Sequence, residues 1–329
     1  MSVVLTKSRV SNAIKCYLSY ALNRFGSAHI AHMPLFVSVE PAAVCQLCCP
    51  ECPVGQLKIK NEKLKITNTP YMSLEVFRRV LEEVKKTAWV MQFYFQGEPL
   101  LNKDLPQMIR EAHWAGLYTI VSTNAQAMTQ EMAQALVTAG LDRIIVSMDG
   151  LTEASYGAYR VGGSLEKTKA ALSYLREAKK RTPYTLHRTP IIELQCLRLR
   201  TNEHEWAALK EQYKALGADR LTLKTAQLYD YTHGHPLMPS KAKYSRYVKG
   251  KDGLFHRRRL GKGCWRVWSG CVVTTTGEVL PCCYDKAHSH AYGNIMNASM
   301  HELFTNTYAR AFRQAAKKER PLICKECYR

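Results

Sequence analysis

Short apolar runs alternate with helix-patterned stretches from about residue 34 to residue 228. Six runs rich in β-branched or aromatic residues predict strands, at residues 35–40, 90–95, 118–122, 143–148, 191–197 and 220–224. Amphipathic stretches predict helices between them, at residues 73–86, 105–115, 130–139, 165–181 and 203–216. Ser73 and Asn202 are expected helix N-caps, and Gly116, Gly140 and Gly217 are expected to follow helices in the left-handed conformation.

This alternation predicts an α/β protein with a parallel sheet and right-handed crossovers. Six such units can form a partly closed barrel or an open doubly wound sheet, and periodicity does not choose between them. In both architectures, ligands bind at the carboxyl ends of the strands. Chemically distinctive segments follow four successive predicted strands, at residues 45–52, 96–99, 122–124 and 147–150. We therefore expect these four segments to converge on one rim.

The two ends of the chain depart from this pattern. Residues 229–262 are expected to form a long basic connection, and residues 263–329 a second, smaller unit with a hairpin at 272–280 and a helix at 300–316. Residues 1–33 contain an amphipathic stretch from Lys7 to Phe25. Such a helix can lie on a membrane surface, but more often it caps the open bottom of a barrel or packs on its side.

The chain is strongly basic, with 47 Lys and Arg against 27 Asp and Glu and a formal charge of +20. This excess favours an anionic partner, such as nucleic acid, anionic lipid or a phosphorylated substrate. Residues 241–262 hold nine Lys and Arg against the single acid Asp252, with Tyr244, Tyr247 and Phe255 among them. An anion-binding role for this segment stands beside the simpler interpretation of a solvated surface.

The cysteine content indicates metal or redox chemistry. There are twelve cysteines, ten of which lie in two groups, at residues 45–52 and 264–327, whereas Cys16 and Cys196 are expected to be buried small hydrophobes. No uncharged apolar run approaches the roughly 20 residues of a membrane span, and the N-terminus lacks a signal-peptide pattern. A cytoplasmic location is therefore the default expectation, and clustered thiols there indicate metal binding more often than disulfides.

The first cysteine group has the spacing Cys45-x3-Cys49-x2-Cys52 directly after the first predicted strand. Three thiolates at this spacing can hold three corners of an iron–sulfur cube and leave one iron open for chemistry. The alternative is a pair of zinc knuckles, for which adjacent Cys48 and Cys49 are poorly placed. Cys48 is expected to be a non-ligand, and the open metal position indicates an enzyme.

This spacing, together with Gly97-Glu98-Pro99 after the second strand, resembles the radical S-adenosylmethionine (SAM) superfamily. The resemblance implies a partial (β/α)6 barrel at about residues 34–228. It also implies SAM and a 4Fe–4S cluster as cofactors, whose reaction yields a 5′-deoxyadenosyl radical that abstracts hydrogen. A reducing electron donor such as flavodoxin or ferredoxin is the implied protein partner.

The resemblance assigns SAM contacts to polar residues at the strand ends. These residues are Gln96, Gly97, Glu98, Pro99, Ser122, Asn124, Ser147, Asp149 and Arg160. Glu98 would meet the SAM amino group and Arg160 its carboxylate. Two positions depart from the family pattern: Gln96 replaces a glycine, and Glu51 stands where an aromatic residue usually supports the adenine.

The second cysteine group resembles the C-terminal extension called SPASM, in its shortened "twitch" form. Its implied ligands are Cys264, Cys282, Cys324 and Cys327, which would hold one auxiliary 4Fe–4S cluster. A four-cysteine zinc site is the competing interpretation. Cys283 could replace Cys282 by a one-residue slip, and Cys271 has no assigned role. Because no cysteine follows Cys327, a second auxiliary cluster is not expected.

The resemblance implies an oxidation in which the auxiliary cluster accepts an electron, and such a reaction also needs a base. Asp285 is the candidate base, with a turn aspartate as the alternative. Four residues after the sixth strand are expected to reach the top of the pocket: Tyr229, Tyr231, His233 and His235.

The basic connection motivates the first substrate hypothesis, an anionic small molecule or lipid-linked compound such as a phosphorylated sugar. A peptide maturase ranks second, because such enzymes usually carry a leader-binding domain and the 33 residues before the barrel are too few for one. An RNA-binding modification protein ranks third, since the charge favours it but no RNA-binding module is evident.

Overall fold

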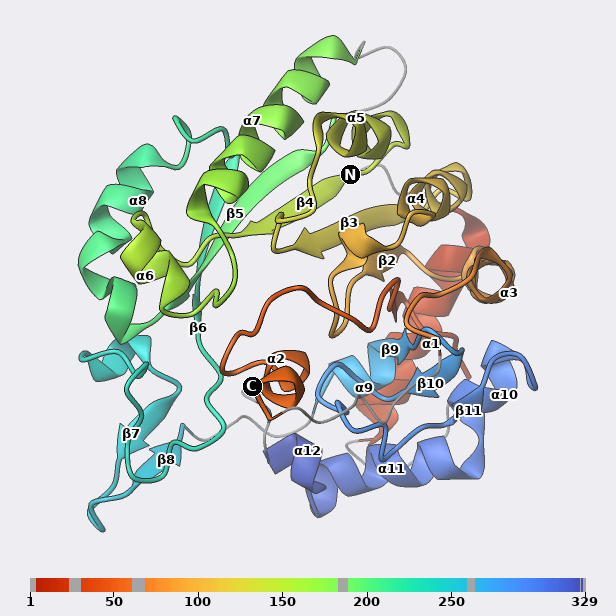
Figure 1. Ribbon diagram of the computed structural model, residues 1–329. Coiled ribbons are helices and arrows are strands. Elements are labelled where there is room, and N and C mark those ends of the chain that lie inside the picture. Colours follow the sequence, from red (N-terminus) through yellow and green to blue (C-terminus); the bar gives the residue numbers. More distant parts are fainter. Residues whose placement is uncertain are drawn as a thin grey trace.

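The computed structural model describes residues 4–23, 31–60, 69–182, 189–258 and 264–325, together with Cys327. Its centre is a nine-stranded sheet with the order β11-β10-β9-β1-β2-β3-β4-β5-β6 (Figure 1). The first six strands are β1 (Phe36–Val39), β2 (Val90–Phe93), β3 (Tyr118–Thr123), β4 (Arg143–Ser147), β5 (Ile191–Arg198) and β6 (Arg220–Thr225). They are parallel and adjacent in chain order, which confirms the predicted partial barrel.

The crossover helices cover the outside of this curved sheet (Figure 1). They are α3 (Leu74–Val84), α4 (Leu105–Trp114), α5 (Gln130–Thr138), α7 (Leu165–Arg181) and α8 (Trp206–Gln212), with the short α6 (Glu153–Gly157) between β4 and α7. Ser73 caps α3 as predicted, because its hydroxyl accepts a hydrogen bond from the Val76 amide. Gly116, Gly140 and Gly217 have φ values of 75°, 84° and 100°, as predicted for residues that follow helices.

One predicted cap is wrong. Asn202 lies inside the 3-10 helix η2 (Arg200–Glu205) and is fully buried. Its side-chain amide donates to the backbone carbonyls of Asp149 and Leu197, and its oxygen accepts from the Trp206 indole. The residue therefore ties η2 to the ends of β4 and β5, and the predicted helix at 203–216 divides into η2 and α8.

The C-terminal hairpin extends the barrel sheet. Its strands β9 (Gly270–Val273) and β10 (Glu278–Leu280) are antiparallel and turn at Gly277, whose φ is 89°. Strand β9 also pairs in parallel with β1, and β11 (Gly293–Asn294) completes this edge. The remaining helices are α9 (Arg266–Ser269), α10 (Met300–Thr305), α11 (Thr307–Lys318) and α12 (Leu322–Lys325). The predicted helix at 300–316 breaks at Asn306, which caps α11. The predicted domain boundaries remain predictions.

The basic connection contains the 3-10 helix η3 (Ala242–Tyr244) and a small hairpin, β7 (Tyr247–Lys249) and β8 (Phe255–Arg257) (Figure 1). The Tyr247 ring stacks on Tyr231 with 4.2 Å between ring centroids, and its hydroxyl donates to the Leu228 carbonyl. The hairpin is thereby packed against the segment after β6. Of its predicted basic residues, Arg259 and Lys262 lie outside the described part of the chain.

Helix α1 (Lys7–Asn23) packs at the amino ends of the strands. The buried Arg9 guanidinium donates to the carbonyls of Lys85, Ala115 and Gly116, where α3 and α4 end. Packing on the bottom of the barrel is thus one of the two roles expected from the sequence. The last residues of the predicted stretch, Arg24 and Phe25, fall outside the described ranges. In the part of the chain that the structure covers, no helix is long and apolar enough to cross a membrane.

Candidate active site

The first cysteine loop lies between β1 and α2 (Pro53–Ile59), at the carboxyl ends of the barrel strands (Figure 1). The Cys45 sulfur accepts hydrogen bonds from the Leu47 amide at 3.4 Å and the Asn124 side-chain amide at 3.3 Å. The Cys49 sulfur accepts one from Arg160 at 3.9 Å. A Cβ on Gly55 would lie 2.3 Å from the Cys49 carbonyl oxygen, so only glycine lets α2 pack against the loop.

The three predicted cluster ligands fit an iron–sulfur cluster. The pKa of Cys45 is raised to about 11, mainly by burial and then by the charges of Glu98, Cys49 and Cys52, so the three thiols are within electrostatic reach of one another. Bound iron would relieve this repulsion. Within the described ranges, no three Cys, His, Asp or Glu residues are grouped to hold one metal ion. Each thiolate of a 4Fe–4S cluster binds a different iron.

Glu98 joins the ends of β2 and β3 from a fully buried position. Its carboxylate accepts hydrogen bonds from the Thr123 hydroxyl at 2.5 Å, the Asn124 amide at 2.8 Å and the Leu100 amide at 3.1 Å. Burial still raises its pKa above the ordinary value. These donors already occupy both carboxylate oxygens, so the predicted contact of Glu98 with the SAM amino group stays a prediction. The sequence reasoning missed Thr123, which alternates in β3 with the predicted Ser122.

Gly97 and Gln96 determine how the Gln96-Gly97-Glu98-Pro99 segment after β2 packs. A Cβ on Gly97 would lie 2.1 Å from the Ala42 carbonyl oxygen, so the loop after β2 can touch the loop after β1 only through glycine. Gln96 replaces the other glycine of the family, and its amide donates to the Lys286 carbonyl at 3.0 Å. Pro99 then opens the 3-10 helix η1 (Pro99–Leu101). The glycine replacement thus connects the barrel to the C-terminal unit.

Asp149 and Arg160 come together after β4. Asp149 is fully buried; one of its oxygens accepts from Arg160 Nε at 2.6 Å and the other from the Leu197 amide at 2.5 Å. Burial alone would lower the pKa of Arg160, but the Asp149 carboxylate and the Cys49 thiolate raise it above its ordinary value. Arg160 is therefore a fixed cation beside the cysteine loop. Ser147 is buried at the end of the same strand.

Glu51 links the cysteine loop to the segment after β6. One carboxylate oxygen accepts from the Tyr229 amide at 2.7 Å, and the other lies 3.2 Å from His235 Nε2. Burial raises the pKa of Glu51 above its ordinary value. Glu51, at the position that is usually aromatic in the family, thus makes polar contacts that join the cysteine loop to the segment after β6. Tyr229 and His235, expected near the pocket top, meet the cysteine loop here.

The four predicted auxiliary ligands form a second group. Burial raises the pKa of Cys282, and the thiolates of Cys283, Cys264 and Cys324 act in the same direction. The pKa of Cys324 is raised to about 11, mainly by burial and then by the thiolates of Cys264 and Cys327. These sulfurs are therefore within electrostatic reach of one another, and their role as the ligands of an auxiliary cluster stays a prediction.

Cys283 lies close enough to Cys282 to raise its pKa, whereas Cys271 has surroundings of its own. The Cys283 sulfur accepts from Arg266 Nη1 at 3.4 Å, and Cys271 is buried in strand β9, where burial raises its pKa to about 12. Cys16 and Cys196 are buried, as predicted.

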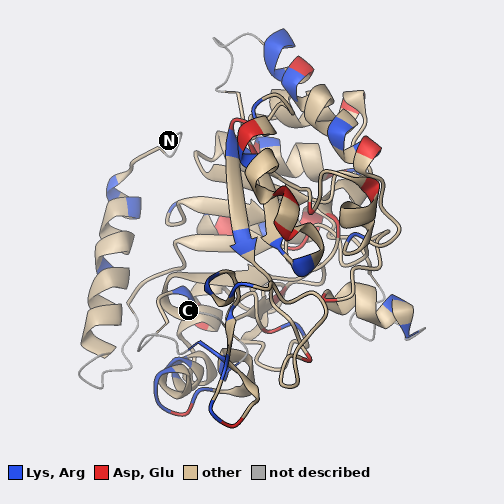
Figure 2. Cartoon of the chain, turned by 90° about the vertical axis from the view of Figure 1, so that its left-hand side faces the viewer, with Lys and Arg blue, Asp and Glu red and all other residues tan. Residues whose placement is uncertain are grey.

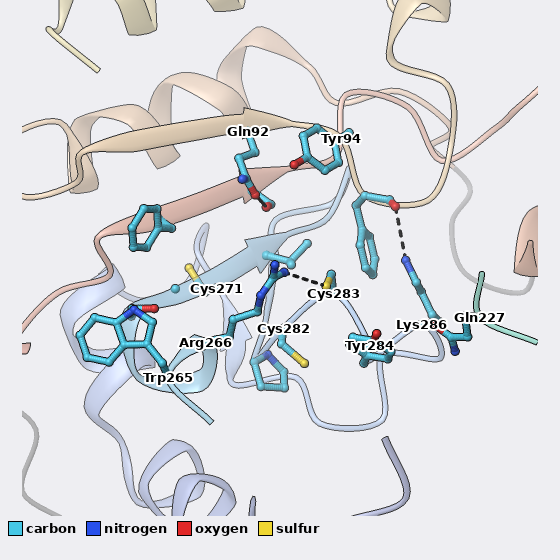
Figure 3. Close-up of a pocket in the computed structure, with 17 residues that line it drawn as sticks. Gln92, Tyr94, Gln227, Trp265, Arg266, Cys271, Cys282, Cys283, Tyr284 and Lys286 are labelled. Carbon is cyan, nitrogen blue, oxygen red and sulfur yellow. Dashed lines mark hydrogen bonds between the residues drawn. The ribbon is translucent and has the colours of Figure 1, made fainter. Parts of the chain in front are cut away.

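A cavity of about 520 Å³ lies between β1, β2, β9 and the loop at residues 281–286 (Figure 3). Its aromatic lining comes from Phe36, Tyr94, Phe95, Trp265 and Tyr284. It also holds two cations, Arg266 and Lys286, but no Asp or Glu among the described residues that line it. The Lys286 ammonium donates to the Phe95 carbonyl at 3.3 Å and lies 4.1 Å from the Phe95 ring centroid.

Lys286 lies within electrostatic reach of both cysteine groups. Burial lowers its pKa, whereas Cys283 and Cys52 act in the opposite direction. The cavity lining thus includes a residue within electrostatic reach of both cysteine groups. A volume of this size is in the range of pockets that enclose a small molecule.

Asp285 does not line this cavity. One of its oxygens accepts from the Ser289 amide and hydroxyl, and the other from the His290 amide. The side chain is fully buried and closes its own loop. This geometry matches the turn aspartate that the sequence left as the alternative and gives no support to a catalytic base.

Comparison with known proteins identifies both parts of the chain. Residues 39–193 match the radical SAM superfamily, and residues 264–328 match the SPASM iron–sulfur cluster-binding domain. A PqqA peptide cyclase of Rhodopseudomonas palustris is 31% identical over 283 residues, which cover 79% of this chain and 70% of the relative. A PqqA peptide cyclase of Xanthomonas campestris pv. campestris is 26% identical over 322 residues, which cover 89% of this chain and 79% of the relative.

A solved structure shows the same fold. Streptococcus suis SuiB bound to S-adenosylmethionine superimposes with a TM-score of 0.65 at 12% identity, over 99% of this chain and 79% of SuiB. At this identity the similarity concerns the architecture alone. It agrees with the parallel barrel sheet and the antiparallel C-terminal strands.

These relatives correct the first substrate hypothesis. An anionic small molecule or lipid-linked substrate is wrong as the main interpretation, because the relatives that match most of the chain are peptide cyclases. The structure gives a physical reason. The basic segment that motivated the hypothesis forms the β7–β8 hairpin, and none of its described residues lines the cavity. The peptide maturase, ranked second from the sequence, is the better-supported interpretation.

The similarity and the two cysteine groups lead to one assignment. SAM and iron–sulfur clusters are the cofactors of the two matched domains, and the thiol geometry fits them. The chain belongs to the radical SAM superfamily, as an enzyme with a C-terminal SPASM domain.

Proposed function

We propose that this enzyme modifies a peptide by joining two of its positions through a new covalent bond. The observation that carries the proposal is the similarity to PqqA peptide cyclases, at 31% identity over 79% of the chain. The cavity between the cysteine groups provides a place for the reacting side chains.

The chain supplies two proposed ligand sets. The ligands of the SAM-binding cluster are Cys45, Cys49 and Cys52, and those of the auxiliary cluster are Cys264, Cys282, Cys324 and Cys327. Bound SAM and the clusters supply hydrogen-atom abstraction and the removal of an electron. Arg160, held by Asp149, offers a guanidinium that suits the SAM carboxylate. Asn124 orients its amide toward Cys45, so the third strand end supports the same site.

The cavity residues provide the recognition of the peptide. Aromatic side chains pack against apolar or aromatic parts of a peptide, and the Arg266 and Lys286 cations suit its acidic groups or carbonyl oxygens. Among the described residues that line the cavity, Arg266 and Lys286 carry positive charge and no Asp or Glu is present, although Arg266 donates to Cys283 and buried Glu40 acts on Lys286 electrostatically. We therefore expect the segment that reacts to place an acidic side chain near Arg266 and Lys286.

The proposal is tested with enzyme reconstituted anaerobically with iron and sulfide, SAM, a reductant and short peptides encoded beside its gene. Joining two positions by one bond removes two hydrogen atoms, so we expect a peptide lighter by two hydrogens together with 5′-deoxyadenosine. A Cys49→Ala variant is the matched control and should give neither product. Equal 5′-deoxyadenosine with and without every peptide, and no change in peptide mass, would overturn the proposal.

We also infer a cytoplasmic location. The chain carries twelve cysteines, seven of which are proposed ligands of iron–sulfur clusters. Thiols and iron–sulfur clusters persist in a reducing compartment, where disulfides are rare. Fractionation of cells that express the chain tests this inference, and recovery in the periplasm or medium would contradict it.

A further inference from the structure

Helix α1 turns its apolar side away from the protein. The residues that face the barrel are Arg9, Asn12, Cys16, Ser19 and Asn23. The opposite side carries exposed Val10, Ile14, Tyr17, Leu18 and Leu22. Their spacing forms one continuous stripe along the helix. Ile14 and Leu18 are each 56% exposed, so the stripe lies on the outer surface. Tyr17, at its edge, is 67% exposed although its ring centroid lies 5.0 Å from that of Trp265.

Specific bonds hold the helix in this orientation. Arg9 donates to four backbone carbonyls, of Val4, Lys85, Ala115 and Gly116. Farther along, the Asn12 amide donates to the Met33 and Thr87 carbonyls. Rotating the helix to bury its apolar side would break these bonds and leave buried carbonyls without donors. The exposed stripe is therefore a fixed feature of the fold.

Other exposed apolar residues lie near the N-terminal end of α1. Val4 and Trp114 line one hollow there, and Trp114 is 72% exposed. Leu5, just before the helix, is 67% exposed. Exposed apolar residues in such number mark an interaction site in a folded protein. Exposed tryptophan is typical of contact with the interfacial layer of a membrane.

The charged residues of α1 are all positive. Lys7 and Lys15 flank the stripe and are exposed, and Lys86 lines the hollow beside Trp114. No Asp or Glu precedes Glu40 in the sequence. Figure 2 shows α1 at the margin of the molecule with only basic charges along it. A second copy of this chain would bring another net charge of +20, so association of two copies through this face is opposed electrostatically.

We propose that α1 lies on an anionic membrane surface, with its apolar stripe in the interfacial layer and its lysines at the lipid headgroups. An apolar face and basic flanks are the two signals that such reversible binding requires. The barrel bottom then faces the membrane, and the carboxyl ends of the strands, with the cysteine loop at residues 45–52, face away from it. Binding at this face leaves the carboxyl ends of the barrel strands free.

Co-sedimentation of the reconstituted enzyme with vesicles tests the proposal. We expect the wild type to pellet with vesicles of equal phosphatidylcholine and phosphatidylglycerol, and to remain in solution with phosphatidylcholine alone. Leu18→Glu should weaken the partitioning by about tenfold or more, because the variant loses a leucine that the membrane would bury. Lys7→Gln and Lys15→Gln should each weaken it by about fivefold. Ser11→Glu adds the same charge on an exposed position of α1 without removing an apolar group, so it should retain more binding than Leu18→Glu.

Two controls test whether an effect on vesicle binding is specific to the residues of α1. Met296→Glu changes an exposed apolar residue outside α1 and should bind like the wild type. Iron content and SAM cleavage without peptide should be unchanged in every variant, because none of these residues contacts the cysteine groups. A wild type that stays in solution with both vesicle types would overturn the proposal. So would a stable dimer that Leu18→Glu converts to monomer in the absence of lipid, since the stripe would then be a protein interface.

Discussion

Asp149 holds Arg160 through a 2.6 Å contact between its carboxylate and Nε, and both side chains are shielded from solvent. The same carboxylate accepts from the Leu197 amide, so Arg160 is fixed to β5 as well as to the end of β4. Arg160 in turn reaches the Cys49 sulfur. The cation proposed to bind SAM is therefore positioned by residues of two strands and one cysteine loop.

Asp149→Asn tests this arrangement. Removing one partner of a buried ion pair costs about 3–5 kcal/mol, so the variant should unfold at a lower temperature and bind SAM more weakly than the wild type. Thermal unfolding and calorimetric SAM titration measure the two effects. Glu111→Gln, which breaks the exposed pair with Arg78, is the control and should change neither. Unaltered SAM affinity in a folded Asp149→Asn protein would contradict the positioning role.

Gly97 should not tolerate a side chain. A Cβ would lie 2.1 Å from the Ala42 carbonyl oxygen, so Gly97→Ala must separate the loops after β1 and β2. We expect a loss of about 1–3 kcal/mol in unfolding free energy and a weaker SAM site. Gly157→Ala is the matched control, because its Cβ would meet nothing within 4 Å. Equal stability of the two variants in denaturant titration would refute the proposed steric constraint.

The neighbouring thiols of Cys282 and Cys283 should differ in function. Cys282 belongs to the group with Cys264 and Cys324, whereas Cys283 lies against Arg266 at the cavity. Two 4Fe–4S clusters bring about eight irons per chain. We expect Cys282→Ser to retain about four irons and Cys283→Ser about eight, by iron and sulfide analysis of anaerobic protein. Loss of iron in Cys283→Ser alone would reverse the ligand assignment.

Glu40 should make stability depend on pH. Burial raises its pKa to about 7, and one of its carboxylate oxygens has no hydrogen-bond partner among the described residues. Its pKa is higher in the folded state than in the unfolded state, where it is near 4.5, so the folded protein binds the extra proton and loses stability as pH rises from about 4.5 to 7. Glu40→Gln should therefore raise stability above pH 7 by up to about 3 kcal/mol, and less at pH 5. If the unfolding free energies of variant and wild type differ by the same amount at all pH values, the prediction is wrong.

The sequence predicts the barrel well because its signals are local. Each predicted strand agrees with an observed one to within about two residues, and the cap at Ser73 follows from its own hydroxyl. The pairing of β9 with β1 joins residues more than 200 positions apart, which no local pattern encodes. Asn202 was misjudged for the same reason, since its partners lie on other elements.

The features of the site that the sequence predicts are also those set by neighbouring residues in the chain. Cysteine spacing predicts which thiols gather, because the loop itself sets their distances. The contact between Glu51 and His235 depends on the fold, since the two residues come from separate segments. Helix α1 shows this dependence on the fold most clearly. Its apolar period is evident in the sequence, but the four carbonyls that bind Arg9 turn that side outward.

Hydrogen transfer from a peptide tests the central claim most directly. The reconstituted enzyme is incubated with SAM, a reductant and a candidate peptide that carries deuterium on its carbon atoms, and the 5′-deoxyadenosine is analysed by mass spectrometry. We predict that deuterium from the peptide appears in 5′-deoxyadenosine while the peptide forms an internal bond. If the 5′-deoxyadenosine stays unlabelled with every candidate and the peptides are recovered unchanged, the enzyme does not act on peptides.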